Sequence, residues 1–381
     1  MTEPRQQALR PSYLPGCLLV LMAVLILLPS GIYLYGITDE TSPSVYSVYL
    51  SDLNGDDHLD AFLVFRNELH KVLLNDGNGY LSKSQELLIH NYVLALGDIN
   101  GDSQTDVILS LVRFEDNKSF LACKMDAPAL VSDNFLNATS LQPFAIKDSD
   151  RDGFPEAFIA GCCSYTSTFI SYGEFASGST CLGENNARAV ALADLNGDKT
   201  LDTFLAKGRV TINGKTQRGL SNEVWFNDGN GNFYDSGQQL GQAESYSVVL
   251  GDVNGDGFID AVVGNRWADD IWLNDGQGNF SNSGQRLGNA LTQTIFLADL
   301  DGDSDLDLFT GGKTSGRIWL NDGAGRFSSG QRIRFGRTEA VTIGDVTGDG
   351  IVDIFIAGVE SYQVWQGDGD GRFTPGLSAD F

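Results

Sequence analysis

Asp252-Val253-Asn254-Gly255-Asp256-Gly257-Phe258-Ile259-Asp260 is the stretch that decides the fold, because versions of it recur along the chain. Its first, third, fifth and ninth positions carry side-chain oxygens, and its seventh position can offer a backbone carbonyl. Calcium takes roughly six to eight oxygen ligands from carboxylates, amides, carbonyls and water. The stretch therefore predicts a calcium loop.

The pattern occurs seven times, at intervals of 46, 50, 46, 58, 47 and 46 residues, which indicates a repeat architecture. The seventh position of each copy contributes its carbonyl, and Asp305 adds a further acid to the sixth copy. We expect up to seven structural Ca²⁺ ions, with weaker binding in the third and seventh copies, where Pro155 precedes Glu156 and Thr347 replaces Asn or Asp. The predicted ligands, copy by copy, are Asp52, Asn54, Asp56, His58 and Asp60; Asp98, Asn100, Asp102, Gln104 and Asp106; Asp148, Asp150, Asp152, Phe154 and Glu156; Asp194, Asn196, Asp198, Thr200 and Asp202; Asp252, Asn254, Asp256, Phe258 and Asp260; Asp299, Asp301, Asp303, Asp305 and Asp307; and Asp345, Thr347, Asp349, Ile351 and Asp353.

The EF-hand is the competing calcium loop, and it requires a glutamate at about its twelfth position and a helix on each side. The residues at that position here are Leu63, Leu109, Ile159, Leu205, Val263, Thr310 and Ile356, none of which carries a carboxylate. The segments that follow the loops are short and rich in β-branched and aromatic residues, as in residues 61–64, 157–160 and 354–357. Each loop is therefore expected to cap a β-hairpin.

A second signature, Asn-Asp-Gly between an apolar run and an aromatic residue, follows in most copies, and it is typical of a tight turn. It occurs in residues 74–80, 226–233, 273–280 and 320–327, and in a looser form in 366–373. A fourth strand is expected at 236–241, 283–288 and 329–334. Four strands in about 46 residues is the size of one propeller blade, so residues 42–381 are predicted to form an all-β, seven-bladed β-propeller. The alternative, an open array of β-units, would need capping repeats, and none is visible.

Together, the two signatures resemble the FG-GAP and VCBS repeat family, which is related to the β-propeller of integrin α-subunits. The resemblance covers about 340 of the 381 residues. It implies that each loop is a calcium site in a β-hairpin. The chain lacks Gly-Ala-Pro tripeptides, stalk domains and a C-terminal membrane helix, so it resembles the integrin head without being an integrin subunit.

Residues 17–36 hold no charge and are long enough to cross about 30 Å of hydrocarbon as a helix. Arginines precede this segment and acidic residues follow it, so residues 1–16 are expected in the cytoplasm and the propeller outside the cell or in the periplasm. We interpret the segment as a transmembrane signal anchor. The alternative is a cleaved signal peptide, which would leave the propeller secreted.

Four cysteines follow this segment, namely Cys123, Cys162, Cys163 and Cys181. In an exported chain they suggest disulfides, with the adjacent Cys162 and Cys163 pairing with Cys123 and Cys181 rather than with each other, while buried free thiols remain the alternative.

The chain carries a formal charge of -25, which argues against a nucleic-acid partner, because phosphate binding takes clustered Lys and Arg.

The loops at the opposite ends of the strands gather basic and aromatic residues, and an insertion near 211–222 falls at the same end. Loops on a rigid scaffold commonly carry recognition, so these residues predict a ligand-binding face, with scattered solvated side chains as the alternative. The candidates are Arg66, Arg113, Tyr165, Lys207, Arg209, Lys215, Arg218, Arg266, Trp267, Lys313 and Tyr362.

The sequence contains three histidines and no nucleophile elbow, zinc-protease motif or phosphate-binding loop. We therefore expect an interaction or adhesion module for a protein or glycan rather than an enzyme. Two alternatives stay open: a carbohydrate-active lyase- or dehydratase-like propeller, because acid–base chemistry can use Asp and Tyr, and a scaffold for assembling surface components.

Overall fold

The computed structural model describes residues 45–65, 70–87, 92–97, 106–110, 120–124, 144–147, 156–159, 167–171, 174–178, 187–212, 215–217, 220–229 and 232–380. The chain divides into Met1–Thr41 and Ser42–Phe381, and all described residues belong to the second unit. Every element in the described residues is a β-strand. The predicted all-β class is confirmed for this part of the chain.

A four-stranded antiparallel sheet, with its strands in chain order, is the recurring unit. The first is formed by β1 (Val45–Ser51), β2 (Asp60–Phe65), β3 (His70–Asn75) and β4 (Leu81–Leu87). The same order recurs in β18 (Ser245–Gly251), β19 (Asp260–Asn265), β20 (Asp269–Asn274) and β21 (Phe280–Leu287). It recurs again in β22 (Thr294–Ala298), β23 (Asp307–Gly311), β24 (Ser315–Asn321) and β25 (Phe327–Arg334), and in β26 (Ala340–Gly344), β27 (Asp353–Ala357), β28 (Ser361–Gly367) and β29 (Phe373–Asp380).

The sheets between β4 and β18 follow the same plan with variations. A three-stranded sheet consists of β5 (Tyr92–Gly97), β6 (Asp106–Ser110) and β7 (Phe120–Lys124). The next four strands are β8 (Phe144–Lys147), β9 (Glu156–Ile159), β10 (Ser167–Ser171) and β11 (Glu174–Gly178). The following sheet pairs β12 (Ala187–Ala193), β13 (Asp202–Lys207), β16 (Glu223–Asn227) and β17 (Phe233–Asp235), and the small hairpin of β14 (Val210–Ile212) and β15 (Lys215–Gln217) is inserted into it.

The second strand of a sheet is buried along its whole length in β2, β13, β19, β23 and β27. Its apolar run is nearly continuous, as a strand covered on both faces requires. The fourth strand is more exposed, and in β21 its two buried ends flank a mostly exposed middle. The hydrophobic core therefore lies between neighbouring sheets, where for example Val262 and Ile271 pack with Leu308 and Trp319.

Both sequence signatures lie at one end of the sheets, which we call the loop end. The predicted calcium loop joins the first strand to the second, and the Asn-Asp-Gly turn joins the third strand to the fourth. The opposite end, which we call the far end, holds the remaining connections, including the turn between β19 and β20. The β14–β15 hairpin also lies in a far-end connection, between β13 and β16, as the insertion near 211–222 predicted.

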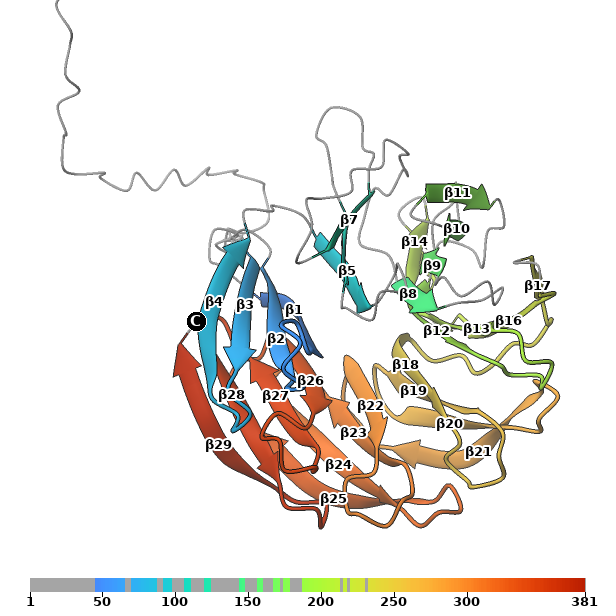
Figure 1. Cartoon of the computed structure of the whole chain (residues 1–381). Helices are drawn as coiled ribbons and strands as arrows, with labels where there is room; N and C mark the ends of the chain where they lie inside the picture. The colour runs from blue at the N-terminus through green and yellow to red at the C-terminus, as the bar shows by residue number, and fades with distance from the viewer. Residues whose placement is uncertain are drawn as a thin grey trace, which may run out of the picture. The chain divides into compact units, whose positions relative to one another are not determined.

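The first and last described sheets pack against each other, and Figure 1 shows them side by side. Leu63 and Leu73 share one core with Phe355 and Val364. In addition, the Tyr362 hydroxyl donates a hydrogen bond of 3.1 Å to the Leu81 carbonyl. Sheets from opposite ends of the sequence are thus directly joined.

One predicted fourth strand is interrupted. Residues 283–288 and 329–334 lie largely within β21 and β25, but β17 ends at Asp235, and Leu240 then forms only an isolated bridge with Asn222. Gly237 adopts a positive φ of 75°, and its amide bonds the Asp235 side chain at 2.8 Å. That local turn takes the place of strand pairing in this sheet.

The predicted transmembrane segment, residues 17–36, and Cys162, Cys163 and Cys181 fall outside the described residues, and the side chain of Cys123 is not described. Within the described ranges, no helix has the length and apolar character that crossing a membrane would need.

Candidate functional site

The ninth position of each described loop holds a fully buried aspartate that joins the loop to the Asn-Asp-Gly turn. Asp260 accepts hydrogen bonds from the Val253 amide at 3.2 Å and from the Asn274 amide at 2.8 Å, one on each carboxylate oxygen. The same pair of contacts recurs at Asp60, Asp202, Asp307 and Asp353. The two signatures of each repeat are therefore one structural unit.

These buried carboxyl groups are poorly accommodated as free anions. Burial raises the pKa of Asp202, Asp260 and Asp307 from 3.8 to about 6, against the opposing effect of the backbone amides that bind them. Repulsion from the acids of the same loop adds to the rise. The loops would consequently gain stability from a nearby positive charge.

The first-position aspartate organises the loop backbone. Asp252 accepts hydrogen bonds from the amides of Gly255 at 2.8 Å, Asp256 at 3.2 Å and Gly257 at 2.8 Å. Gly257, at the sixth position, has a φ of 87°. Non-glycine residues occupy this position in three other described loops, where Asp57, Lys199 and Ser304 take φ values of 65°, 69° and 74°. The loop thus keeps its left-handed turn even where glycine is absent, at some backbone strain.

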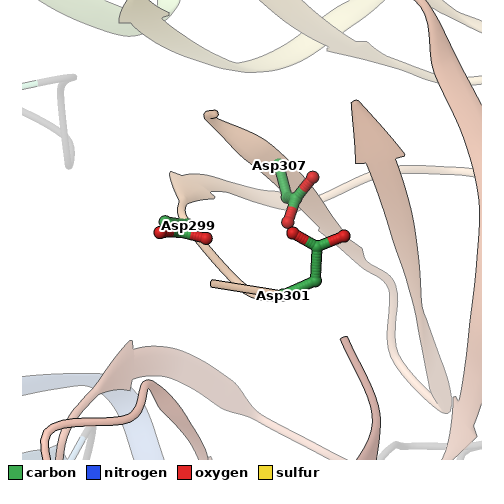
Figure 2. Close-up of side chains that lie close together, drawn as sticks. All are labelled: Asp299, Asp301 and Asp307. Carbon is green, nitrogen blue, oxygen red and sulfur yellow. The ribbon is translucent and has the colours of Figure 1, made fainter. Parts of the chain in front are cut away.

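In the sixth loop, Asp299, Asp301 and Asp307 offer oxygens that all lie within 4.8 Å of one another. Figure 2 shows the Asp301 and Asp307 carboxylates directed toward one another. Oδ1 of Asp301 is buried and has no hydrogen-bond partner. Burial, followed by the charge of Asp303, raises the pKa of Asp301. An oxygen cluster with an unsatisfied buried member is the donor set that a hard cation takes.

Loops with asparagine at the third position are arranged differently. Nδ2 of Asn254 donates a hydrogen bond of 2.8 Å to Asp256, and Oδ1 accepts one of 3.1 Å from the Asp256 amide. Asn54 and Asn196 likewise donate to the fifth-position aspartates. A half-turn of the asparagine side-chain amide would exchange the positions of its nitrogen and oxygen. The oxygen would then face the carboxylate of the fifth-position aspartate.

The side chain at the seventh position packs on the glycine of the Asn-Asp-Gly turn, as with His58 on Gly77 and Phe258 on Gly276. This explains why the position tolerates an apolar residue. The Asp305 carboxylate lies against Gly323 in the same way, and it is not a member of the cluster formed by Asp299, Asp301 and Asp307.

The predicted ligands of the second and third copies have side chains that fall outside the described residues. They are Asp98, Asn100, Asp102, Gln104, Asp106, Asp148, Asp150, Asp152, Phe154 and Glu156.

The asparagine of the Asn-Asp-Gly turn connects neighbouring repeats, a role that the sequence did not indicate. Nδ2 of Asn274 donates to the Ile259 carbonyl at 3.0 Å and to the Leu195 carbonyl of the preceding loop at 2.8 Å. Asn321 reaches Val253 and Asn75 reaches Val346 at 2.8 Å each. The link from Asn75 to Val346 joins the first repeat to the last.

A glutamine in the fourth strand, or just beyond its end in the case of Gln238, makes a second connection between repeats. Gln238, Gln285 and Gln331 each bind the turn of the next sheet through both atoms of the side-chain amide. The signal in the sequence was the recurrence of Ser-Gly-Gln, which by itself indicated only a strand.

At the far end, two predicted recognition residues, Arg209 and Arg266, lie beside one buried acid, Glu244. Arg209 Nε lies 3.7 Å and Arg266 Nη1 lies 3.5 Å from the Glu244 carboxylate. The Arg266 guanidinium also lies 5.9 Å from the centre of the Trp267 ring, and Trp267 is 63% exposed. Glu244, which sequence reasoning did not identify, pairs with both arginines, and one of them, Arg266, lies beside the exposed tryptophan.

Other predicted recognition residues have different environments. Lys313 is exposed in a far-end pocket. The prediction that Tyr362 belongs to the recognition face is wrong, because its side chain is buried and stacks on Phe355 at 5.2 Å between ring centres. Lys207 is also buried and pairs with Glu223 at 2.5 Å. The side chains of Arg66, Arg113, Tyr165, Lys215 and Arg218 fall outside the described residues.

The FG-GAP-like repeat model matches residues 210–263, 252–310 and 299–356. These matches cover the fifth, sixth and seventh of the predicted calcium loops. They confirm the expected repeat type in this part of the chain. No curated protein matches the sequence.

Solved structures share the fold at low sequence identity. The structure of BBS1N in complex with ARL6DN, soaked with mercury, has a TM-score of 0.58 at 10% identity and covers 83% of this chain and 89% of that chain. A functionally unknown protein from Desulfotomaculum acetoxidans has a TM-score of 0.54 at 12% identity, over 80% of this chain and 95% of that chain. The fold is β-propeller-like, and identities this low support no conclusion beyond the fold.

Proposed function

From the FG-GAP-like repeats of this chain, we propose that it is a membrane-anchored, calcium-stabilised β-propeller of seven blades that binds a protein or glycan outside the cytoplasm. Seven copies of the loop signature support the number of blades. The contact between the first and last described sheets supports closure, because a closed ring joins its ends and buries the faces that an open array would expose.

Calcium in the loops is supported by their donor chemistry. The side chains at the first, third, fifth and ninth positions and the carbonyl at the seventh would hold the ion, and only oxygen atoms are involved. The orphaned Oδ1 of Asp301 and the raised pKa of the buried ninth-position acids both fit a cation that neutralises them. Bound calcium would supply charge neutralisation and would cross-link the loop.

The recognition site that we propose is the far-end cluster of Arg209, Glu244, Arg266 and Trp267. The observation that carries it is the exposed Trp267 ring beside an arginine that a buried acid holds in place. Tryptophan and arginine are frequent hot spots of binding interfaces, and an arginine fixed by Glu244 loses less side-chain entropy when it binds a ligand.

Partner capture tests this proposal. The full chain and a variant with Arg266→Glu and Trp267→Ala would be used to capture partners from surface extracts and from a glycan array. A matched control, Arg326→Glu with Tyr234→Ala, makes the same change of charge and also removes one aromatic ring, at exposed residues of the loop end. We expect the far-end variant to lose partners that the control retains. Equal capture by both variants would contradict the assignment of this cluster, and turnover of a sugar polymer would favour the enzyme alternative.

A further inference from the structure

A polar pocket of about 550 Å³ opens at the far end, between the β20–β21 and β23–β24 hairpins. Its walls are the start of β20, the connection from β21 to β22, the end of β23, the turn between β23 and β24, the first part of β24, and one residue of β25. Pockets that hold small organic ligands commonly measure roughly 300 to 1,000 Å³. The volume is therefore suited to a ligand larger than a simple inorganic ion.

Three cations line this pocket in a chain whose formal charge is -25. They are Lys313 in the β23–β24 turn, Arg317 in β24 and Arg332 in β25. The acid in the lining is Asp269, which is 1% exposed and is bound by the Asn265 amide at 2.8 Å and the Thr292 hydroxyl at 2.9 Å. The charge facing the pocket is thus positive.

The arginines are held by neighbouring groups. The Arg317 guanidinium lies 5.5 Å from the centre of the Trp319 ring and contacts the Ser329 hydroxyl. Arg332 donates a hydrogen bond of 3.4 Å to the Ser315 hydroxyl. A guanidinium can pair with a carboxylate or sulfate through two parallel hydrogen bonds, and fixing it beforehand lowers the entropy cost of binding.

The remaining walls carry hydroxyl groups and backbone. Thr292 and Thr310 are both fixed, the first by Asp269 and the second by the indole nitrogen of Trp319 at 3.1 Å. The Trp319 ring itself is 8% exposed and lies beneath Arg317, so it offers no open face on which a nucleotide base could stack. Hydroxyl and backbone groups around a cationic wall match a ligand that carries several hydroxyls and a negative charge.

We propose that this pocket binds an anionic saccharide, a sugar ring bearing a carboxylate or sulfate, with Lys313, Arg317 and Arg332 around the anionic group and the threonine wall near the sugar hydroxyls. The proposal rests on the proposed function as a binding module and assigns it a ligand class. Asp269 is a positioning residue, because it is buried, holds the Thr292 hydroxyl with one carboxylate oxygen and binds the Asn265 amide with the other.

Calorimetric titration of the full chain with trigalacturonate, a sulfated disaccharide, neutral maltotriose and inorganic sulfate tests the ligand class. We expect one or both anionic saccharides to bind, with affinity at least about tenfold above that for maltotriose or sulfate. Binding of sulfate as tight as that of the saccharides would mean an adventitious ion only, and it would overturn the proposal. Failure of both anionic saccharides to bind would also overturn it, even if partner capture through Trp267 succeeded.

Paired charge reversals test the location. Lys313→Glu with Arg332→Glu changes two exposed residues of the pocket, and Arg326→Glu with Arg372→Glu makes the same change of charge at the loop end. We expect the pocket variant to weaken anionic-saccharide binding at least about tenfold and the control to weaken it much less. If the two pairs weaken binding equally, the effect is one of overall charge and the pocket assignment is wrong. If only Arg266→Glu with Trp267→Ala abolishes saccharide binding, the proposed function stands and the pocket assignment falls.

Discussion

Gln285 in one sheet holds the turn that ends in Phe327 in the next sheet. Its Nε2 donates a hydrogen bond of 2.5 Å to the Gly325 carbonyl, and its Oε1 accepts one of 3.0 Å from the Phe327 amide. Gln238 and Gln331 bind the corresponding turns of their own neighbours. Adjacent repeats are therefore joined by polar contacts at the loop end as well as by the apolar core.

Gln285→Ala should lower the free energy of unfolding by about 1 to 3 kcal/mol, because it leaves a backbone carbonyl and amide without their partners. Denaturant unfolding of the full chain in calcium measures the change. Gln277→Ala, at an exposed position of a nearby turn, is the matched control and should have little effect. Equal stability of the two variants would show that this contact adds nothing to the packing of the sheets.

Asn274→Leu should destabilise the protein by about 3 kcal/mol or more, because the asparagine side chain makes four hydrogen bonds at a nearly buried site. Two of these bonds hold the turn, and one reaches the preceding repeat at Leu195. Asn282→Ala serves as a control, since this exposed side chain caps a single glycine amide. A loss at Asn274 no larger than that at Asn282 would contradict the linking role of this asparagine.

Calcium should raise the melting temperature of the full chain relative to a chelator, since a ligand that binds only the folded state stabilises it by about 3 kcal/mol at a hundredfold excess over Kd. Superimposable melting curves would refute structural calcium.

Asp301→Ala should reduce the rise in melting temperature that calcium causes. In chelator this variant should be at least as stable as the unmodified chain, because the substitution removes repulsion between acids. Asp380→Ala, which removes an exposed acid outside the loops, should change neither value appreciably.

The stability contribution of Asp269 should decrease as the pH rises. Burial raises the pKa of Asp269 from 3.8 to about 7, partly opposed by its bonds from Asn265 and Thr292 and reinforced by the charge of Asp270. The folded state therefore binds the proton more tightly than the unfolded state does. This contribution is fully present below about pH 4 and is lost as the pH passes through 7.

Asp269→Asn removes this titration and should become more stable relative to the unmodified chain as the pH rises from 4 to 8, by roughly 1 kcal/mol or more. The measurement is the difference in unfolding free energy between the two proteins across that range, in saturating calcium. A difference that is independent of pH would contradict the raised pKa.

Residues 17–36 should keep the protein in the membrane fraction after alkaline carbonate extraction, because an uncleaved apolar helix of this length is retained by lipid. Replacing Val24 and Leu27 with arginine should release the chain from that fraction. Release of the unmodified chain, with an N-terminus found beyond residue 36, would instead identify the segment as a cleaved signal peptide.

For the part of the chain that the structure describes, the sequence by itself determined the repeat, the β class and the position of each loop. Periodic acids at 46- to 58-residue intervals and glycines suited to left-handed turns are local features, so no knowledge of distant contacts was needed to find them. Most strand positions followed for the same reason, since apolar runs such as 261–263 can be covered only within a packed sheet. The strand expected at 236–241 is the exception, because β17 ends at Asp235.

Only the tertiary structure decided which residues join one repeat to another and which are accessible. Asn274 and Gln285 looked like turn and strand residues, and their partners lie 79 and 40 residues away in the sequence. Tyr362 looked like an exposed aromatic and is buried between the first and last sheets, whereas Glu244 and Asp269 showed no pattern at all. The physical reason is that burial and hydrogen bonding at these positions depend on a neighbouring repeat or a distant loop, whose approach the local sequence does not encode.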